Sequence, residues 1–219
     1  MVELKGVSKK FDTILFEDFN IIFEKGKTTV LLGNSGCGKT ALINILLGFL
    51  KPDKGYADLG RAERVSVVFQ ENRLINSINV LNNLLCVNND DKLCREVLEK
   101  LNLKDSLLKY PEELSGGMKR RVALARAIVY GGDLFIMDEP FNGIDIILKE
   151  RLMPMVKSVL HGKTAVLITH EIQEAVNMGD NIVILGGRPL KILKIIENKN
   201  NVNDVSYIEN LLKNTECDF

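Results

Sequence analysis

The chain has 219 residues, of which 46% are hydrophobic, and it carries 29 basic and 29 acidic side chains. The hydrophobic content is ample for a packed core, and the length allows one large domain or two small ones. Because the charges balance, no overall basic field favours nucleic acid as a partner, and the longest apolar stretch, residues 41–50, is well short of the roughly 20 residues of a membrane span.

Apolar runs alternate with helical patterns along the chain, which predicts an α/β fold. Three of these runs are almost wholly apolar, as expected for parallel strands buried on both faces. Residues 71–132 show little strand character and several helical periods, so we expect a helical insertion there. The expected strands are 2–5, 20–23, 28–32, 65–69, 134–137 and 164–168. The expected helices are 41–47, 91–101, 116–130 and a last one near 205–212, with a polar loop at 87–91 and a flexible connection at 197–203.

Residues 33–40 read Gly-Asn-Ser-Gly-Cys-Gly-Lys-Thr, the complete pattern G-x-x-x-x-G-K-[ST], between an expected strand and an expected helix. In such a loop, backbone N–H groups close around phosphates and the helix N-terminus adds its dipole. Lys39 reaches the β and γ phosphates, and the Thr40 hydroxyl ligates Mg²⁺. The alternative is a chance glycine-rich turn before a lysine, expected on the order of once in a hundred such chains. The residues predicted to bind the nucleotide here are Gly33, Asn34, Ser35, Gly36, Cys37, Gly38, Lys39 and Thr40.

A second motif is acidic. The apolar residues 134–137 end in Asp138 and Glu139, which places both acids at the carboxyl end of a parallel strand, where we expect the phosphate loop beside them. Phosphoryl transfer depends on metal, cationic donors and water orientation, so Asp138 would hold Mg²⁺ through water and Glu139 would polarise the attacking water. The alternative is a surface Asp-Glu pair that starts a turn before Pro140.

A third motif, residues 114–121, reads Leu-Ser-Gly-Gly-Met-Lys-Arg-Arg. Ser115 is a good helix N-cap, and Gly116 and Gly117 permit close backbone approach, so a phosphate can dock at this helix N-terminus. The alternative is a plain capped helix whose basic residues, 119–121, are solvated. With the two motifs above, this segment resembles the signature sequence of ATP-binding cassette (ABC) proteins.

The resemblance implies roles for four further residues. In the family, an aromatic residue at the position of Phe11 stacks on adenine, and the Q-loop glutamine, here Gln70, contacts Mg²⁺ and the attacking water. Asp145 matches the D-loop aspartate that communicates across a dimer, and His170 matches the switch histidine that contacts the γ-phosphate. The plain alternatives are a core Phe, a helix N-cap for Asp145, and an ordinary Gln and His.

The resemblance also implies the architecture: a RecA-like P-loop nucleotide-binding core, an N-terminal antiparallel β portion and an inserted α-helical subdomain. We predict one ATPase domain over residues 1–219, with its core at 1–70 and 133–219 and the insertion at 71–132. The implied cofactors are ATP and Mg²⁺, and two copies are expected to face head to tail. The implied catalytic residues are Lys39, Gln70, Glu139 and His170, and the implied metal ligands are Thr40, Gln70 and Asp138.

The leading hypothesis for function is the ATPase subunit of a membrane transporter. Residues 68–74, Met118 and residues 183–189 are similar to the nitrate, sulfonate and taurine importer branch. The implied partners are integral membrane permease subunits and an extracytoplasmic substrate-binding protein, with no nucleic acid. An exporter and a soluble, non-transport ABC ATPase remain alternatives. Met118 and Arg120 stand where Gln is common in the signature, so we expect altered contacts near the ribose rather than lost hydrolysis.

The N-terminus lacks the apolar segment of a signal peptide, so we expect the chain to stay in the cytoplasm. The resemblance to a transporter ATPase implies a peripheral position at the cytoplasmic face of the membrane. The spacing of the cysteines fits neither a zinc ribbon nor a disulfide framework, and we expect free thiols. Cys37 differs from the other cysteines, because a thiol near Lys39 in the phosphate loop is expected to be reactive. The four cysteines are Cys37, Cys86, Cys94 and Cys217.

Overall fold

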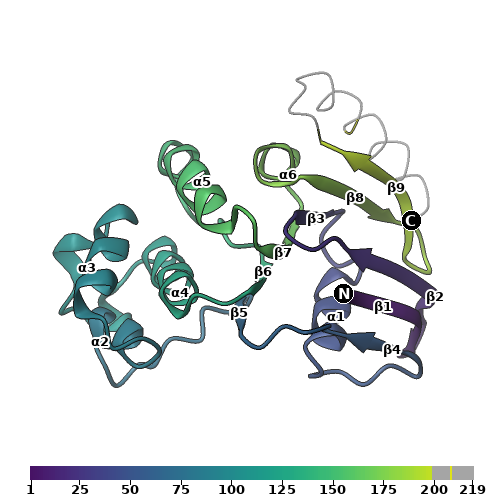
Figure 1. The fold of residues 1–219 in the computed structure, drawn as a ribbon, viewed down its shortest axis with the longest axis horizontal. Helices are drawn as coiled ribbons and strands as arrows, with labels where there is room; N and C mark the ends of the chain where they lie inside the picture. Colours follow the sequence, from purple (N-terminus) through teal and green to yellow (C-terminus); the bar gives the residue numbers. More distant parts are fainter. Residues whose placement is uncertain (199–207, 209–219) are drawn as a thin grey trace. The chain divides into compact units, whose positions relative to one another are not determined.

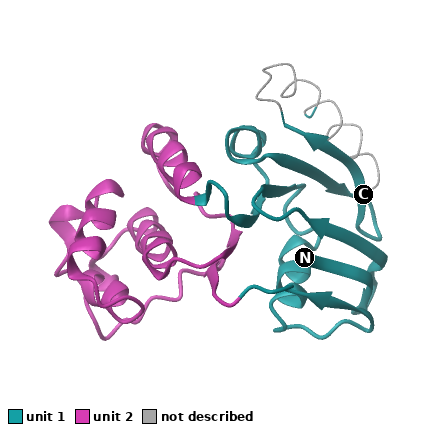
Figure 2. Ribbon diagram, in the orientation of Figure 1, with its two compact units in different colours: residues 1–62, 160–219 teal, residues 63–159 magenta. Residues whose placement is uncertain are grey.

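The computed structural model of the chain describes residues 1–198 and residue 208. The chain divides into two compact units, which we describe separately (Figure 2): unit 1 is residues 1–62 with 160–219, and unit 2 is residues 63–159. Apart from Ile208, which is helical and buried, the helix expected near 205–212 lies outside the described residues, as do residues 199–203 of the expected connection.

Unit 1 contains two β-sheets (Figure 1). In the antiparallel sheet the order is β2-β1-β4, with β1 at Val2–Lys10, β2 at Ile14–Phe23 and β4 at Lys54–Asp58. In the other sheet, the strands that belong to this unit follow the order β7-β3-β8-β9, with β3 at Thr28–Leu32, β7 at Thr164–Thr169, β8 at Asn181–Gly186 and β9 at Lys191–Glu197. Among the residues of this unit that the structure describes continuously, 1–62 and 160–198, the helices are α1, Lys39–Leu46, and α6, Ile172–Met178.

The buried strands of unit 1 are the ones that the sequence predicts best. Every residue of β3 and of β7 is buried, and both strands are parallel to their neighbours in the core, so their side chains are uniformly apolar or small. By contrast, β1 and β2 bury one face only and extend beyond the ranges predicted for them. β4 is largely exposed, so its residues show no hydrophobic pattern, and the sequence did not predict this strand. The sequence predicts a flexible connection that begins at residue 197. This prediction is wrong for Glu197, which is the last residue of β9.

Unit 2 contains a parallel strand pair and most of the helices. β5, Val65–Val68, pairs with β6, Leu134–Asp138, in parallel. The α-helices are α2 at Val80–Leu85, α3 at Asp91–Lys100, α4 at Gly116–Tyr130 and α5 at Ile146–Leu160, whose last residue is assigned to unit 1, and short 3₁₀ helices span Lys104–Ser106 and Pro111–Glu113. α4 packs against α2, α3 and β5.

The ends of the helices in unit 2 follow from their capping residues. Asp90 accepts a hydrogen bond from the Leu93 amide (3.0 Å) at the start of α3, and Ser115 accepts one from the Met118 amide (3.3 Å) at the start of α4. Gly131 ends α4 in the left-handed conformation. The regular elements within residues 71–132 are all helical, as expected from the sequence, while the assignment of 71–132 as an inserted subdomain stays a prediction.

Candidate functional site

The phosphate loop of unit 1 connects β3 to α1, as predicted. Lys39 is only 5% exposed, although it is charged. Its Nζ donates hydrogen bonds to the carbonyl oxygens of Gly33 (2.7 Å) and Asn34 (2.8 Å), and lies 3.7 Å from the Cys37 Sγ. The loop therefore curls around its own lysine, and the binding of a phosphate by this ammonium stays a prediction.

Two glycines of the loop are required, Gly33 by close approach and Gly38 by its backbone conformation. A Cβ on Gly33 would lie 2.6 Å from the carbonyl oxygen of Leu185 in β8, which leaves no room for a side chain. Gly38 has a φ of 113° and is the N-cap of α1, where no side-chain hydrogen bond caps the helix. The helix dipole and the N-terminal amide groups are thus available to an anion at this end of α1.

His170 lies at the same sheet edge as the phosphate loop. Leu32 of β3 is paired with Thr169 of β7, so the loop and His170 follow the ends of adjacent parallel strands. The turn that carries the histidine is fixed by Thr169, whose Oγ1 donates to Glu174 Oε2 (2.6 Å) and accepts from the Glu171 amide (3.0 Å). Unit 1 therefore brings the predicted switch residue and the predicted phosphate loop to one edge.

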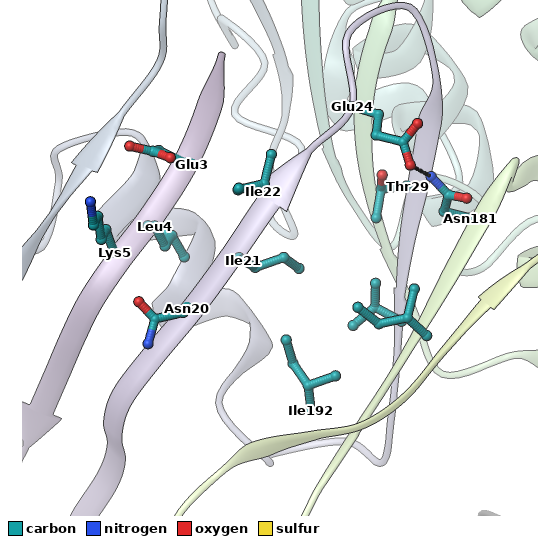
Figure 3. Close-up of a pocket in the computed structure, with 12 residues that line it drawn as sticks. Glu3, Leu4, Lys5, Asn20, Ile21, Ile22, Glu24, Thr29, Asn181 and Ile192 are labelled. Carbon is teal, nitrogen blue, oxygen red and sulfur yellow. Dashed lines mark hydrogen bonds between the residues drawn. The ribbon is translucent and has the colours of Figure 1, made fainter.

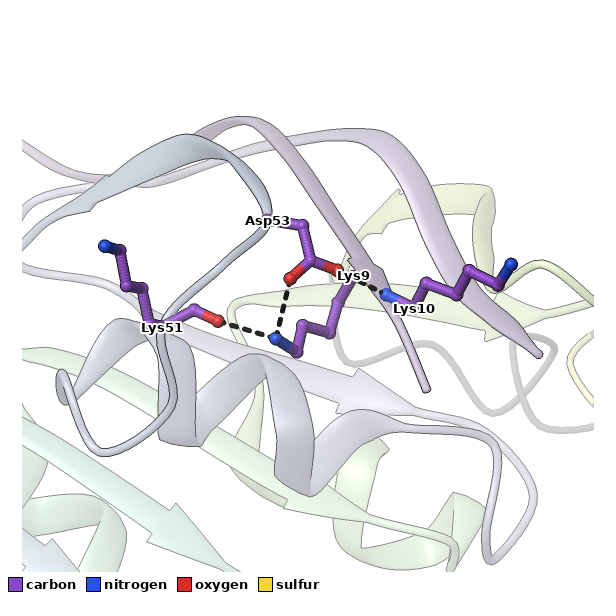
Figure 4. Close-up of polar contacts among 4 residues, drawn as sticks. All are labelled: Lys9, Lys10, Lys51 and Asp53. Carbon is purple, nitrogen blue, oxygen red and sulfur yellow. Dashed lines mark hydrogen bonds and ion pairs between the residues drawn. The ribbon is translucent and has the colours of Figure 1, made fainter. Parts of the chain in front are cut away.

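Phe11 lies in the turn between β1 and β2 and is 57% exposed, so the alternative of a core phenylalanine is wrong. The Lys9 ammonium is 5.5 Å from the centre of the Phe11 ring, within cation–π range. Lys9 Nζ also donates to the Lys51 carbonyl (2.9 Å) and to Asp53 Oδ1 (2.8 Å), while Asp53 Oδ2 accepts from the Lys10 amide (2.7 Å), as Figure 4 shows. The Lys9 hydrogen bond lowers the pKa of Asp53. Sequence reasoning missed this cluster, because Lys9 and Asp53 are 44 residues apart.

In unit 2, the strand pair brings two predicted residues to one edge. Val68 of β5 is paired with Met137 of β6, so Gln70 and Glu139 follow the ends of adjacent strands. Asp138 is 3% exposed, so the alternative of a surface acidic pair is wrong for it. Glu139 has a φ of 48°, and its Oε2 accepts a hydrogen bond from Asn142 Nδ2 (2.9 Å). The expected proximity of these acids to the phosphate loop stays a prediction.

The signature segment contacts the segment that leads to Asp145, also within unit 2. A Cβ on Gly117 would lie 2.5 Å from the Gly143 carbonyl oxygen, whereas a Cβ on Gly116 would have no heavy atom within 4 Å. Asp145 Oδ1 accepts from the amides of Ile147 (3.0 Å) and Leu148 (3.3 Å), so this aspartate caps α5. Its N-cap geometry is therefore established, and its role across a dimer stays a prediction.

Two arginines of α4 are buried, so the alternative of a plain helix with solvated basic residues is wrong for them: Arg120 is 3% and Arg121 is 9% exposed. Arg121 Nη1 donates to the carbonyls of Leu101 and Asn102, each at 2.8 Å, and burial lowers its pKa. Arg120 donates to carbonyls that include those of Gln70 and Glu139. Neither contact is visible in a local sequence pattern.

A pocket of about 420 Å³ opens in unit 1 between the two sheets. Its wall is largely apolar, with Leu4, Ile21 and Ile192 among the lining residues, and at one side Asn181 Nδ2 donates to Glu24 Oε1 (2.9 Å) (Figure 3). None of the residues predicted to bind the nucleotide lines this pocket, so the candidate site lies elsewhere.

In the described part of the chain, no helix is long and apolar enough to cross a bilayer. Cys37, Cys86 and Cys94 are free thiols, as expected, and Cys217 lies outside the described residues.

Comparisons with known proteins agree on one family. The family model described as "ABC transporter" matches residues 16–142. The taurine import ATP-binding protein of Pseudomonas aeruginosa is 34% identical over 196 residues, which cover 82% of this chain and 74% of that protein. An aliphatic sulfonates import ATP-binding protein of Rhodococcus jostii is 37% identical over 191 residues, which cover 84% of this chain and 70% of that protein.

Solved structures share the fold. A dimeric ATP-binding cassette in a post-hydrolysis state, bound to ADP and Pi, matches with a TM-score of 0.80 and 26% identity over 91% of this chain and 99% of that one. A dimeric bacterial ABC transporter cassette matches with the same TM-score and coverage at 24% identity. The predicted α/β cassette fold, with its antiparallel β portion, is therefore confirmed.

Proposed function

The chain belongs to the ABC transporter family and is an ABC ATPase, and we propose that it powers a membrane importer of a small solute. The observation that carries the proposal is a complete phosphate loop with Lys39 held inside it, in a chain about a third identical to import ATP-binding proteins. The names of these relatives favour taurine or another small sulfonate as the solute.

We assign the binding of the nucleotide first. The backbone of residues 33–40 would surround the phosphates, and Lys39 would leave its two carbonyl partners for the β and γ phosphates. His170 would contact the γ-phosphate from the neighbouring strand end. Phe11 presents enough open surface to stack on adenine. Each contact stabilises charge or orients the substrate, and these two effects provide most of the catalysis of phosphoryl transfer.

The acidic strand end of unit 2 supplies the groups for water activation. Glu139 would orient and polarise the attacking water, and Gln70 would contact the same water. The hydrogen bond from Asn142 helps to orient the Glu139 carboxylate before substrate arrives. This preorganisation lowers the cost of reaching the reactive geometry.

The donor set fits Mg²⁺. Thr40, Gln70 and Asp138 offer hydroxyl, amide and carboxylate oxygens, the hard ligands that Mg²⁺ prefers, and Mg²⁺ is usually held by one or two carboxylates together with substrate phosphates. When bound, the ion would neutralise charge on the phosphates. Asp138 is buried at the end of β6, so its carboxylate has little conformational freedom to lose on binding.

We propose that the working form is a head-to-tail dimer. The exposed N-terminal end of α4, with Ser115, Gly116 and Gly117, would dock on the γ-phosphate held by a second copy, and Asp145 would lie at the same interface. Since the γ-phosphate bridges two copies, ATP closes the dimer and hydrolysis releases it. The further proposed partners are integral membrane permease subunits and an extracytoplasmic substrate-binding protein, which place this chain at the cytoplasmic face of the membrane.

Replacement of the proposed catalytic carboxylate tests the enzyme assignment. Glu139→Gln keeps the side-chain size and the hydrogen bond from Asn142, so we expect ATP binding to persist, turnover to fall by about 100-fold or more, and a dimer to accumulate with ATP. Light scattering with and without ATP, beside a phosphate-release assay, measures both. A variant that stays monomeric with ATP and hydrolyses at the wild-type rate would contradict the role of Glu139.

Uptake in cells tests the importer assignment. A strain that lacks this chain should lose uptake of at least one of three labelled solutes: taurine, an alkanesulfonate or nitrate. The wild-type chain should restore uptake, and Lys39→Ala should not. Unchanged uptake of all three, with efflux or a soluble process affected instead, would overturn the importer assignment and favour an exporter or a soluble ABC ATPase.

A further inference from the structure

Arg120 connects two separate segments of unit 2. Its Nη1 donates to the carbonyl oxygens of Phe69 and Gln70 (3.3 Å to the latter) and lies 3.4 Å from Asn72 Oδ1. Its Nε and Nη2 donate to the Glu139 carbonyl (3.0 and 2.5 Å), and Nη2 also donates to the Asp138 carbonyl. One guanidinium therefore bonds to both strand ends that carry the residues proposed to activate water.

This contact set needs an arginine. A guanidinium has five donors in a rigid planar fork, whereas a lysine ammonium is a point charge and a glutamine amide donates from a single nitrogen. Arg120 is 3% exposed, and a buried charge is tolerated only where its donors are satisfied. The five carbonyl hydrogen bonds provide that satisfaction, so neither lysine nor glutamine can reproduce it.

Glu139 has left-handed backbone geometry, with a φ of 48°. That conformation is unfavourable for a residue with a Cβ and persists where the surroundings enforce it, often at functional sites. The Glu139 carbonyl accepts two bonds from Arg120 and one from the Asn142 amide (3.1 Å). Arg120 thus helps to hold the backbone that aims the carboxylate.

We propose that Arg120 is a positioning residue for ATP hydrolysis, which acts through Glu139 and Gln70 by fixing the two strand ends relative to each other. The proposal rests on the proposed function of these two residues. It also gives Arg120, which departs from the signature pattern described in the sequence analysis, a structural role: in this chain the two strand ends are held together by a buried cation.

The test compares Arg120→Lys with Arg121→Lys. The control makes the same change one residue along α4, at a second buried arginine whose carbonyl partners, Gly117, Leu101 and Asn102, include neither strand end. For Arg120→Lys we expect kcat to fall by about 10- to 100-fold with the KM for ATP within about twofold, because a small misplacement of a reacting group costs that much. Arg121→Lys should leave kcat within about twofold of wild type, even if it lowers the thermal stability.

A double-mutant cycle supplies a readout that a purely structural role would not move. If Arg120 acts through Glu139, then Arg120→Lys should lower kcat far less in a Glu139→Gln background than in wild type. Should Arg120→Lys fail to fold, Arg120→Gln serves in its place, with a kcat loss expected for the same reason. A variant with the kcat of wild type, or a full loss retained in the Glu139→Gln background, overturns the proposal. A wild-type protein that binds ATP without turnover overturns the proposed function itself, and this proposal with it.

Discussion

The phosphate loop of unit 1 and the acidic strand end of unit 2 are held in place in opposite ways. In the loop, Lys39 bonds to carbonyls six and five residues earlier, so the hydrogen bonds that hold this lysine lie within one short segment. At the strand end, Arg120 bonds to Gln70 and Glu139, which are 50 and 19 residues away. The difference teaches that a contiguous motif carries its own geometry, whereas a strand end depends on a brace from another element.

The comparison predicts that the largest loss of activity follows a substitution within the phosphate loop. Lys39→Ala should lower kcat/KM for ATP by at least about 100-fold, because no other side chain is proposed to supply a cation to both the β and γ phosphates. Nucleotide binding and phosphate release measure the effect. Lys104→Ala is the control: this lysine is exposed and paired with Glu99 at 2.6 Å, and we expect no change in activity. Equal losses in both variants would mean that the loop has no special role.

A smaller effect is expected where unit 2 depends on close backbone approach. Gly117→Ala should destabilise the protein by about 1–3 kcal/mol, because its Cβ would lie 2.5 Å from the Gly143 carbonyl and the backbone would have to shift. Gly116→Ala is the matched control, since its Cβ meets no heavy atom within 4 Å, and there we expect no loss and a gain of up to about 1 kcal/mol. Urea unfolding measures both, and equal destabilisation would contradict the close contact.

The same contrast explains what the sequence could predict. The phosphate loop, the fully buried β3 and β7, and α4 with its Ser115 cap each carry their signal within a few consecutive residues. The three motifs and their order were enough to identify the family, and with it the fold. The half-exposed strands of unit 1 were found only in part, because alternating polar residues dilute the apolar signal.

What the sequence could not predict depends on contacts between distant segments. Next to Lys119, Arg120 looks like one more solvated basic residue, and its burial becomes visible only when α4 is packed against the ends of β5 and β6. Asn142 is three residues after Glu139, yet an asparagine at that distance has no meaning until the left-handed turn at Glu139 is known. Lys9 and Asp53 meet only because β1 and β4 are neighbours in one sheet.

The smallest effect on activity is expected at Lys9 and Asp53. In this pair, unit 1 has a long-range contact that holds a turn in place, as Arg120 holds the strand ends in unit 2. Asp53→Asn should remove the ion pair of the Lys9 ammonium and leave its hydrogen bond to the Lys51 carbonyl. Because this ammonium lies 5.5 Å from the centre of the Phe11 ring, we expect the turn proposed to hold adenine to loosen. We expect the KM for ATP to rise by about threefold with kcat unchanged, because only ground-state binding is affected. Glu99→Gln, which breaks the exposed pair with Lys104, is the control and should alter neither constant.

The pH dependence of stability checks the pair independently of catalysis. The Lys9 hydrogen bond lowers the pKa of Asp53 in the folded protein, so the carboxylate binds its proton more weakly when folded than when unfolded. Its stabilising contribution is therefore present above the usual aspartate pKa of about 4 and is lost as the pH falls through the lowered folded value. The urea midpoint of wild type should exceed that of Asp53→Asn near neutral pH, and the gap should close in acid. If the two urea midpoints are equal near neutral pH, or differ more in acid, then the Lys9–Asp53 pair does not stabilise this turn.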